Sequence, residues 1–178
     1  MSLKKLITAV ILVSLIGTVV WIRSLGAPDS PPVITLSATD VINASPDEVW
    51  ALISDFEGYS QWNPYLTKIE GAFKVGETVS VTLVDANFEG PFVVKPRMFS
   101  IESGKSFSWK GQVGIQGVMD THHVFAISET EDGNTQIHQY EEFRGLIAKT
   151  MADKKDRHAN TQHAFAAMHS AIKAELEN

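Results

Sequence analysis

The sequence predicts one α+β domain of about 145 residues behind a single N-terminal apolar helix. Three observations lead to this prediction. Residues 6–22 carry no charge, residues 68–143 contain short β-like runs separated by turn residues, and residues 149–176 contain neither proline nor glycine. With 178 residues and 44% apolar content, the chain has room for one membrane segment and one domain with a core, but not for two such domains.

The charge-free segment 6–22 is typical of a membrane span. Its 17 residues cover roughly 25 Å at 1.5 Å per residue, slightly less than a hydrocarbon core of ~30 Å. Trp21 favours the membrane interface and makes up part of the difference. The competing interpretation is a cleaved signal peptide, which needs small residues before the cut. Residues 25–28, Leu-Gly-Ala-Pro, match that requirement poorly, so we favour an uncleaved anchor.

The flanking charges predict the orientation of this helix. Lys4, Lys5 and the free amino terminus outweigh Arg23, so we expect the N-terminus in the cytoplasm and the domain in the periplasm or outside the cell. The chain then divides into a membrane anchor or possible signal peptide (1–23), a semi-extended proline-rich linker (24–33) and the domain (34–178).

The domain begins with a strand and two short helices. Residues 35–43 alternate as a strand does. Ser45 is a natural N-cap, Pro46 suits the first helical position and Glu48 can complete a capping box, which predicts a helix over 46–54. The aromatic-rich residues 55–65, interrupted by glycine and proline, predict a second short helix.

Six β-like runs and one long helix follow. The runs are typical of an antiparallel meander and cover residues 68–73, 78–84, 92–101, 106–113, 118–128 and 136–143. The remaining segment, from about residue 149 to 176, is rich in helix-forming residues. Its first half, 153–162, is polar, whereas the second half carries Phe165, Met168 and Ile172 at helical spacing. We expect the second half to anchor the core.

This order of elements resembles the START-related SRPBCC superfamily, with its polyketide cyclase/dehydrase-like members. The residues that carry the resemblance are VINASPDEVW at 41–50, DFEGYSQWNP at 55–64, Gly111, HVF at 123–125 and EFRG at 142–145. The resemblance implies a helix-grip fold, in which a curved antiparallel sheet wraps the long C-terminal helix and leaves a cavity. It also implies binding of lipids, sterols, hormones or pigments, or in some members cyclisation or dehydration. The polar half of the helix should then border the cavity mouth.

Aromatic side chains are the candidate ligand contacts, although a domain of this size needs most of its aromatic residues for the core. Trp62 and Trp109 stand out because an indole N–H can also bind a polar ligand atom. We expect the ligand site to draw on Trp62, Trp109, His123, Phe125, Phe143 and Phe165.

Two residues are candidates for proton transfer, His123 and Glu142. His123 is adjacent to His122 on a strand, so at most one of them can face a cavity. Glu142 shares a strand face with Arg144, and the two could polarise a carbonyl in the cavity or form an ion pair at the sheet surface. The histidine spacing does not favour metal binding, and we expect no metal and no cofactor.

The net charge of the domain limits the classes of partner that it can bind. The first 33 residues carry three basic residues and one acidic residue, so the rest of the chain has a net charge of −8 against −6 for the whole. An acidic domain repels phosphate backbones, and nucleic acid is not an expected partner. The sequence favours a membrane-tethered domain that binds an apolar or amphipathic small molecule. The alternatives are a cyclase/dehydratase-type enzyme acting on a polyketide-like substrate and an interaction protein with a filled core.

The predicted orientation can be tested with a reporter that is active only in the cytoplasm. Fused to the C-terminus, it should be inactive, because Lys4 and Lys5 hold the opposite end of the span in the cytoplasm. A fusion to a variant with both lysines replaced by glutamate serves as the comparison. An active reporter on the unchanged chain would reverse the predicted localisation.

Overall fold

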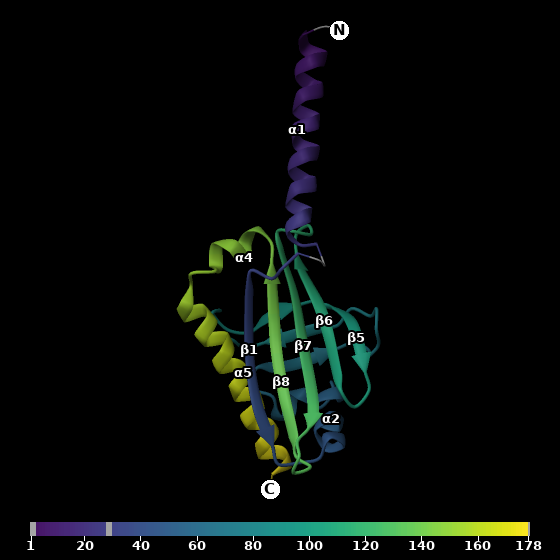
Figure 1. Ribbon diagram of the computed structural model, residues 1–178, viewed down its shortest axis with the longest axis vertical. Coiled ribbons are helices and arrows are strands. Elements are labelled where there is room, and N and C mark those ends of the chain that lie inside the picture. The colour runs from purple at the N-terminus through teal and green to yellow at the C-terminus, as the bar shows by residue number, and fades with distance from the viewer. Residues whose placement is uncertain (1–2, 28–29, 178) are drawn as a thin grey trace.

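The structure is a computed structural model that describes residues 3–27 and 30–177. Helix α1 (Leu3–Leu25) projects from one end of an α+β domain (Figure 1). Antiparallel strands make up most of the domain, and the long C-terminal helix runs diagonally past them (Figure 1). The α+β fold class and the helix-grip arrangement are therefore confirmed.

Five strands form the larger antiparallel sheet, in the order β1-β8-β7-β6-β5. Their bounds are β1 (Ile34–Ile42), β5 (Arg97–Glu102), β6 (Ser106–Val113), β7 (Met119–Glu129) and β8 (Thr135–Arg144). The register pairs Phe107 with Phe125 and His123 with Glu141, so these side chains share one face of the sheet. That face is concave and points toward the C-terminal helix and the cavity.

A second, three-stranded sheet consists of β2 (Leu66–Glu70), β3 (Ser80–Leu83) and β4 (Phe92–Val94). An isolated bridge between Thr78 and Arg97 joins it to the larger sheet. The prediction of one strand over residues 92–101 was wrong, because β4 and β5 lie in different sheets. The physical reason is Pro96, which has no N–H for a ladder and separates the two strands.

The two short helices after β1 are confirmed as α2 (Pro46–Ser54) and α3 (Tyr59–Trp62). The Ser45 hydroxyl accepts a hydrogen bond from the Glu48 backbone N–H, and the Glu48 carboxylate accepts one from the Ser45 N–H. This capping box satisfies two N–H groups that the first helical turn leaves free.

The C-terminal segment forms two helices, not the predicted single one. Helix α4 (Leu146–Met151) is followed by α5 (Lys155–Leu176), and Lys154 between them has a non-helical backbone. The backbone N–H of Leu146 donates to the Gly117 carbonyl at 2.8 Å, and that of Ile147 donates to the Val118 carbonyl at 2.9 Å. Helix α4 is thus fixed by a distant loop, which leaves no local signal in its own sequence.

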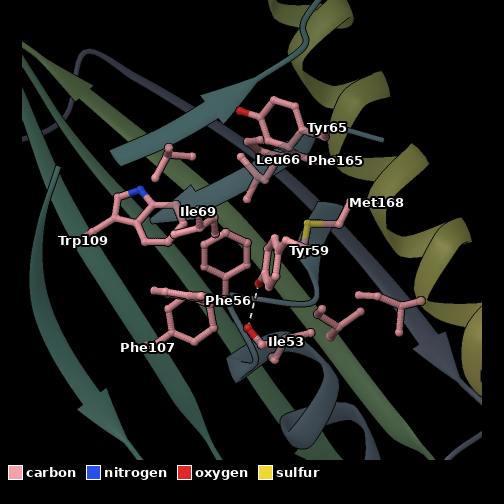
Figure 2. Close-up of a cluster of buried hydrophobic side chains, with 14 of the residues drawn as sticks. Ile53, Phe56, Tyr59, Tyr65, Leu66, Ile69, Phe107, Trp109, Phe165 and Met168 are labelled. Atoms are coloured by element: carbon pink, nitrogen blue, oxygen red, sulfur yellow. Dashed lines mark hydrogen bonds between the residues drawn. The ribbon is translucent and has the colours of Figure 1, made fainter. Parts of the chain in front are cut away.

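The second half of α5 anchors the core, as predicted. Phe165, Met168 and Ile172 are fully buried. Figure 2 shows Phe165 and Met168 beside an aromatic cluster that the short helices and β6 supply. Within the cluster the Tyr59 hydroxyl donates to the Ile53 carbonyl at 2.6 Å, which provides a partner for a buried polar atom (Figure 2).

This packing predicts a large difference between two substitutions in α5. Phe165→Ala should lower the free energy of unfolding by about 3–5 kcal/mol, because the side chain leaves a cavity in a packed core. Lys155→Ala, at an exposed position, should change it by less than about 0.5 kcal/mol. Chemical denaturation measures both. Equally small losses would mean that Phe165 is not a core residue.

Candidate ligand-binding cavity

A cavity of about 580 Å³ lies between the concave face of the larger sheet, the three-stranded sheet and the start of α5. Helix α4 closes one side of it through Ala148 and Met151. Most of its wall is apolar. The apolar lining residues are Ile34, Leu36, Leu66, Val81, Leu83, Phe88, Phe92, Val93, Val94, Pro96, Trp109, Val113, Met119, Phe143, Ala148 and Met151.

The cavity has a closed end and an open end. At the closed end Tyr65, Trp109 and His123 are buried. At the open end the lining residues are exposed to solvent and come from the β3–β4 loop, from β4 and the residue after it, from the end of β6 and from the start of α5. They are Phe88, Phe92, Val93, Lys95, Gln112, Val113, Gly114 and Arg157. Arg157 belongs to the polar first half of α5, which therefore borders the mouth as expected.

His123 and Glu141 form the polar part of the closed end. The Gln139 amide Nε2 donates to His123 Nε2 at 2.9 Å, which leaves the imidazole hydrogen on Nδ1. That Nδ1 atom lies 3.9 Å from Glu141 Oε2, beyond hydrogen-bond distance. Burial lowers the pKa of His123 to about 3, so the imidazole is neutral at physiological pH.

Glu141 is the acidic group at this end. Burial raises the pKa of its carboxyl to about 7, although a hydrogen bond from Thr121 acts in the opposite direction. The side chain keeps 15% of its exposure, which is consistent with a position on the cavity wall. Burial also raises the pKa of the Tyr65 hydroxyl, which therefore remains protonated. Below about pH 7 the closed end thus presents groups that can donate hydrogen bonds without carrying charge.

A hydrogen-bond network holds the β3–β4 loop against α5 beside the mouth. Asp85 accepts hydrogen bonds from the Thr161 hydroxyl at 2.8 Å and from the Asn87 backbone N–H at 2.7 Å. The Asn87 amide donates to the Arg157 carbonyl at 2.9 Å. All four residues line the cavity, so this network fixes the width of the opening.

The structure brings three of the six predicted ligand contacts to the cavity wall, namely Trp109, His123 and Phe143. Phe125 and Phe165 lie behind His123, with ring centroids 4.5 Å and 5.2 Å from the imidazole. Both are fully buried and are not lining residues.

Trp62 also lies away from the cavity wall. Its ring packs on Tyr59 with centroids 5.0 Å apart. Its buried indole Nε1 has no hydrogen-bond partner among the residues that the structure describes. Ligand contact remains a prediction for these six residues.

The expectation that Glu142 could face the cavity is corrected by the structure. Glu142 is on the opposite face of β8, where its carboxylate lies 3.0 Å from the Arg144 guanidinium and 3.5 Å from His122 Nδ1. This is the surface ion pair that the sequence left as the other possibility. Glu141 takes the inward position, together with Phe143.

Sequence reasoning missed Glu141, although one signal was present. Side chains alternate along a strand, so Phe143 and Glu142 cannot both face inward. Because Phe143 was predicted as a ligand contact, the alternation should have pointed to Glu141, two residues before it, as the acidic residue that faces the cavity. No comparable local pattern points to Tyr65 or Asp85, because distant segments bring them to the cavity.

Metal binding gains no support from the geometry. Across residues 3–27 and 30–177, no group of three or more His, Asp or Glu side chains is placed to hold a metal ion. Within the cavity the Asp85 carboxylate is already occupied by hydrogen bonds from Thr161 and Asn87.

The fold and the cavity place the chain in a class of α+β domains in which a curved sheet and a C-terminal helix enclose a binding site. The family described as polyketide cyclase / dehydrase and lipid transport matches residues 33–178. The chain belongs to this family. No curated protein matches the sequence.

Solved structures share the fold at low sequence identity. A hypothetical protein from Helicobacter pylori is 13% identical, with a TM-score of 0.66 over 86% of this chain and 93% of its own. A protein from Chromobacterium violaceum is 14% identical, with a TM-score of 0.61 over 81% and 97%. DynU16, from the dynemicin biosynthetic locus, is 11% identical, with a TM-score of 0.60 over 81% of this chain and 47% of its own. Identities this low show the fold alone.

The buried Glu141 carboxyl predicts a pH dependence of stability. Between about pH 4.5 and pH 7 the folded chain retains a proton that the unfolded chain releases, so this group makes folding less stable as pH rises. Glu141→Gln removes the effect. Relative to the wild type, the variant should gain up to about 3 kcal/mol over this range. Chemical denaturation of the full chain in detergent at a series of pH values measures the difference.

Glu142→Gln is the matched control, because Glu142 lies on the outer face beside Arg144. It should show no such gain. The contributions of His123 and of other groups are common to the wild type and both variants, and largely cancel in the comparison. Parallel pH curves for the wild type and Glu141→Gln would contradict the burial of a protonated carboxyl.

Proposed function

We propose that this chain is a membrane-tethered domain that binds an apolar or amphipathic small molecule in its internal cavity. The observation that carries the proposal is a cavity of about 580 Å³ with a largely apolar wall and a few polar groups at its closed end. This volume falls within the range of small-molecule sites, about 300–1,000 Å³. The family, which includes lipid-transport proteins, supports the same class of ligand.

The polar groups narrow the chemistry of the ligand. Tyr65 and a protonated Glu141 can donate hydrogen bonds, and the neutral His123 ring can donate one from Nδ1. A ligand with an apolar body and a carbonyl or hydroxyl at one end would match both parts of the cavity. A permanently charged group at the closed end would be costly to desolvate.

The tether is the second part of the proposal. Helix α1 contains a 19-residue stretch, Ile7–Leu25, that is long and apolar enough to cross a membrane, and no residue of it is fully buried. A signal sequence would have the same properties. The poor cleavage pattern at residues 25–28 favours an anchor, with the domain outside the cytoplasm.

A cyclase/dehydratase-type enzyme is the second candidate, and one observation favours it. His123 Nδ1 and Glu141 Oε2 lie 3.9 Å apart on the cavity wall, and the pKa of Glu141 is raised to about 7. A carboxyl with such a pKa can exchange a proton at neutral pH. The separation exceeds a hydrogen bond, which is why binding remains the first proposal.

A bound molecule should accompany the purified full chain. Native mass spectrometry of the chain released from detergent should show a bound mass. Leu83→Trp, which places a larger side chain at a lining position, should lower the bound fraction at least about fivefold, because it removes cavity volume. Val75→Trp, an exposed position away from the cavity, is the matched control and should retain the wild-type fraction. Any mass that all three chains retain belongs to lipid on α1.

Equal occupancy in Leu83→Trp and the wild type would rule out the cavity as the binding site. The same preparation tests the enzyme candidate, since the extracted molecule can be returned to fresh protein and followed over time. Loss of one water that depends on Glu141 but survives Glu142→Gln would favour the dehydratase over the binding module.

A further inference from the structure

We infer that the β6–β7 connection (residues 114–118) and the start of α4 dock on the surface of the bilayer that α1 spans, so that the cavity mouth borders the membrane. This inference rests on the membrane tether of the proposed function. It adds an interaction surface, whose partner is a lipid bilayer with its headgroups and upper acyl chains.

Helix α1 is seated directly on this connection. Gly117 has a positive φ of 89°, and a Cβ added there would overlap the backbone carbonyl of Ile22. The Gln116 amide donates to the Gly26 carbonyl at 3.2 Å. The last turn of the span therefore touches the domain directly.

The depth of the connection follows from this contact. Trp21 and Arg23 lie at the C-terminal end of the apolar stretch, and such residues favour the membrane interface. The headgroup region on each side of a bilayer is about 5–8 Å thick. Because Gly117 contacts the backbone at Ile22 and Arg23, the β6–β7 connection lies at the level of that region.

The surface around this contact is apolar. Val113, Ile115 and Leu146 are 56%, 46% and 40% exposed. The Leu146 N–H donates to the Gly117 carbonyl, which brings the start of α4 to the same place. Figure 1 shows α4 at the end of the domain from which α1 leaves. Exposed apolar side chains at interface depth gain free energy by entering the bilayer.

Charge at this end also matches a membrane surface. Residues 146–158, which contain α4 and the start of α5, carry four basic side chains and two acidic ones, in a domain with a strongly negative net charge. The basic residues are Lys149, Lys154, Lys155 and Arg157. Anionic headgroups attract such a segment, whereas they repel the remaining acidic surface.

The docked surface adjoins the mouth. Val113 belongs to both the apolar patch and the cavity lining, and Gly114, Met119 and Met151 also line the cavity. A molecule dissolved in the bilayer could then enter the cavity without crossing water. Exchange with the membrane thus becomes the expected route for an apolar ligand.

Depth-dependent quenching tests the docking on the full chain, which contains no cysteine. Single cysteines are introduced as Ile115→Cys at the patch, Asp132→Cys in the β7–β8 turn at the opposite end, and Ser14→Cys within α1. Each is labelled with a polarity-sensitive fluorophore. The vesicles contain phosphatidylcholine with a minor share of phosphatidylserine and carry nitroxide lipids in both leaflets, so the direction of insertion does not affect the result.

A headgroup nitroxide should quench the label of Ile115→Cys at least about threefold more than that of Asp132→Cys. A mid-chain nitroxide should quench the label of Ser14→Cys. If Ser14→Cys is quenched but Ile115→Cys is as weakly quenched as Asp132→Cys, the docking inference is wrong and the tether stands. If Ser14→Cys is not quenched, the tether fails and the docking fails with it. Ligand binding is measured separately and is unaffected by either outcome.

Discussion

The packing of α5 on the concave face of the larger sheet is the contact on which the rest of the domain depends. Phe165, Met168 and Ile172 are fully buried there, and each such side chain contributes about 1.5–3 kcal/mol when it leaves water. They cover only the part of the sheet that the second half of α5 reaches. The first half offers Arg157, His158 and Thr161 in their place, and these line the cavity. One helix thus stabilises the fold and leaves space in it.

The polar groups at the closed end of the cavity lower the stability of the fold, and the packing of the core does not require them. A buried carboxyl with a pKa near 7 and a buried neutral imidazole both lose hydration, and neither forms an ion pair that compensates fully. Gln139 offers one hydrogen bond to His123, but its own Oε1 has no partner in the described part of the chain. Groups of this kind in a cavity are typical of sites that act on a ligand.

Local patterns in the sequence predicted much of the fold. The Ser45–Glu48 capping box and the alternation along β6–β8 act between neighbouring residues, so the sequence alone reveals them. The split at Pro96 was also readable, since proline interrupts a ladder. The separation of α4 from α5 before Lys155 could not be predicted from the sequence, because hydrogen bonds to the distant residues Gly117 and Val118 position α4. The site was less predictable for the same reason, since separate segments bring Tyr65 and Asp85 to the cavity.

The contact between α1 and the domain has a consequence for any cleavage of the chain after α1. The three carbonyls of the weak cleavage pattern are all occupied in the folded chain. Those of Leu25 and Ala27 accept hydrogen bonds from the Ser30 hydroxyl, and that of Gly26 accepts one from Gln116. A peptidase binds an extended segment through hydrogen bonds to its backbone, and these carbonyls are among the groups that it would need. Processing at this point would therefore have to precede folding of the β6–β7 connection, and a chain that folds first would keep α1 attached.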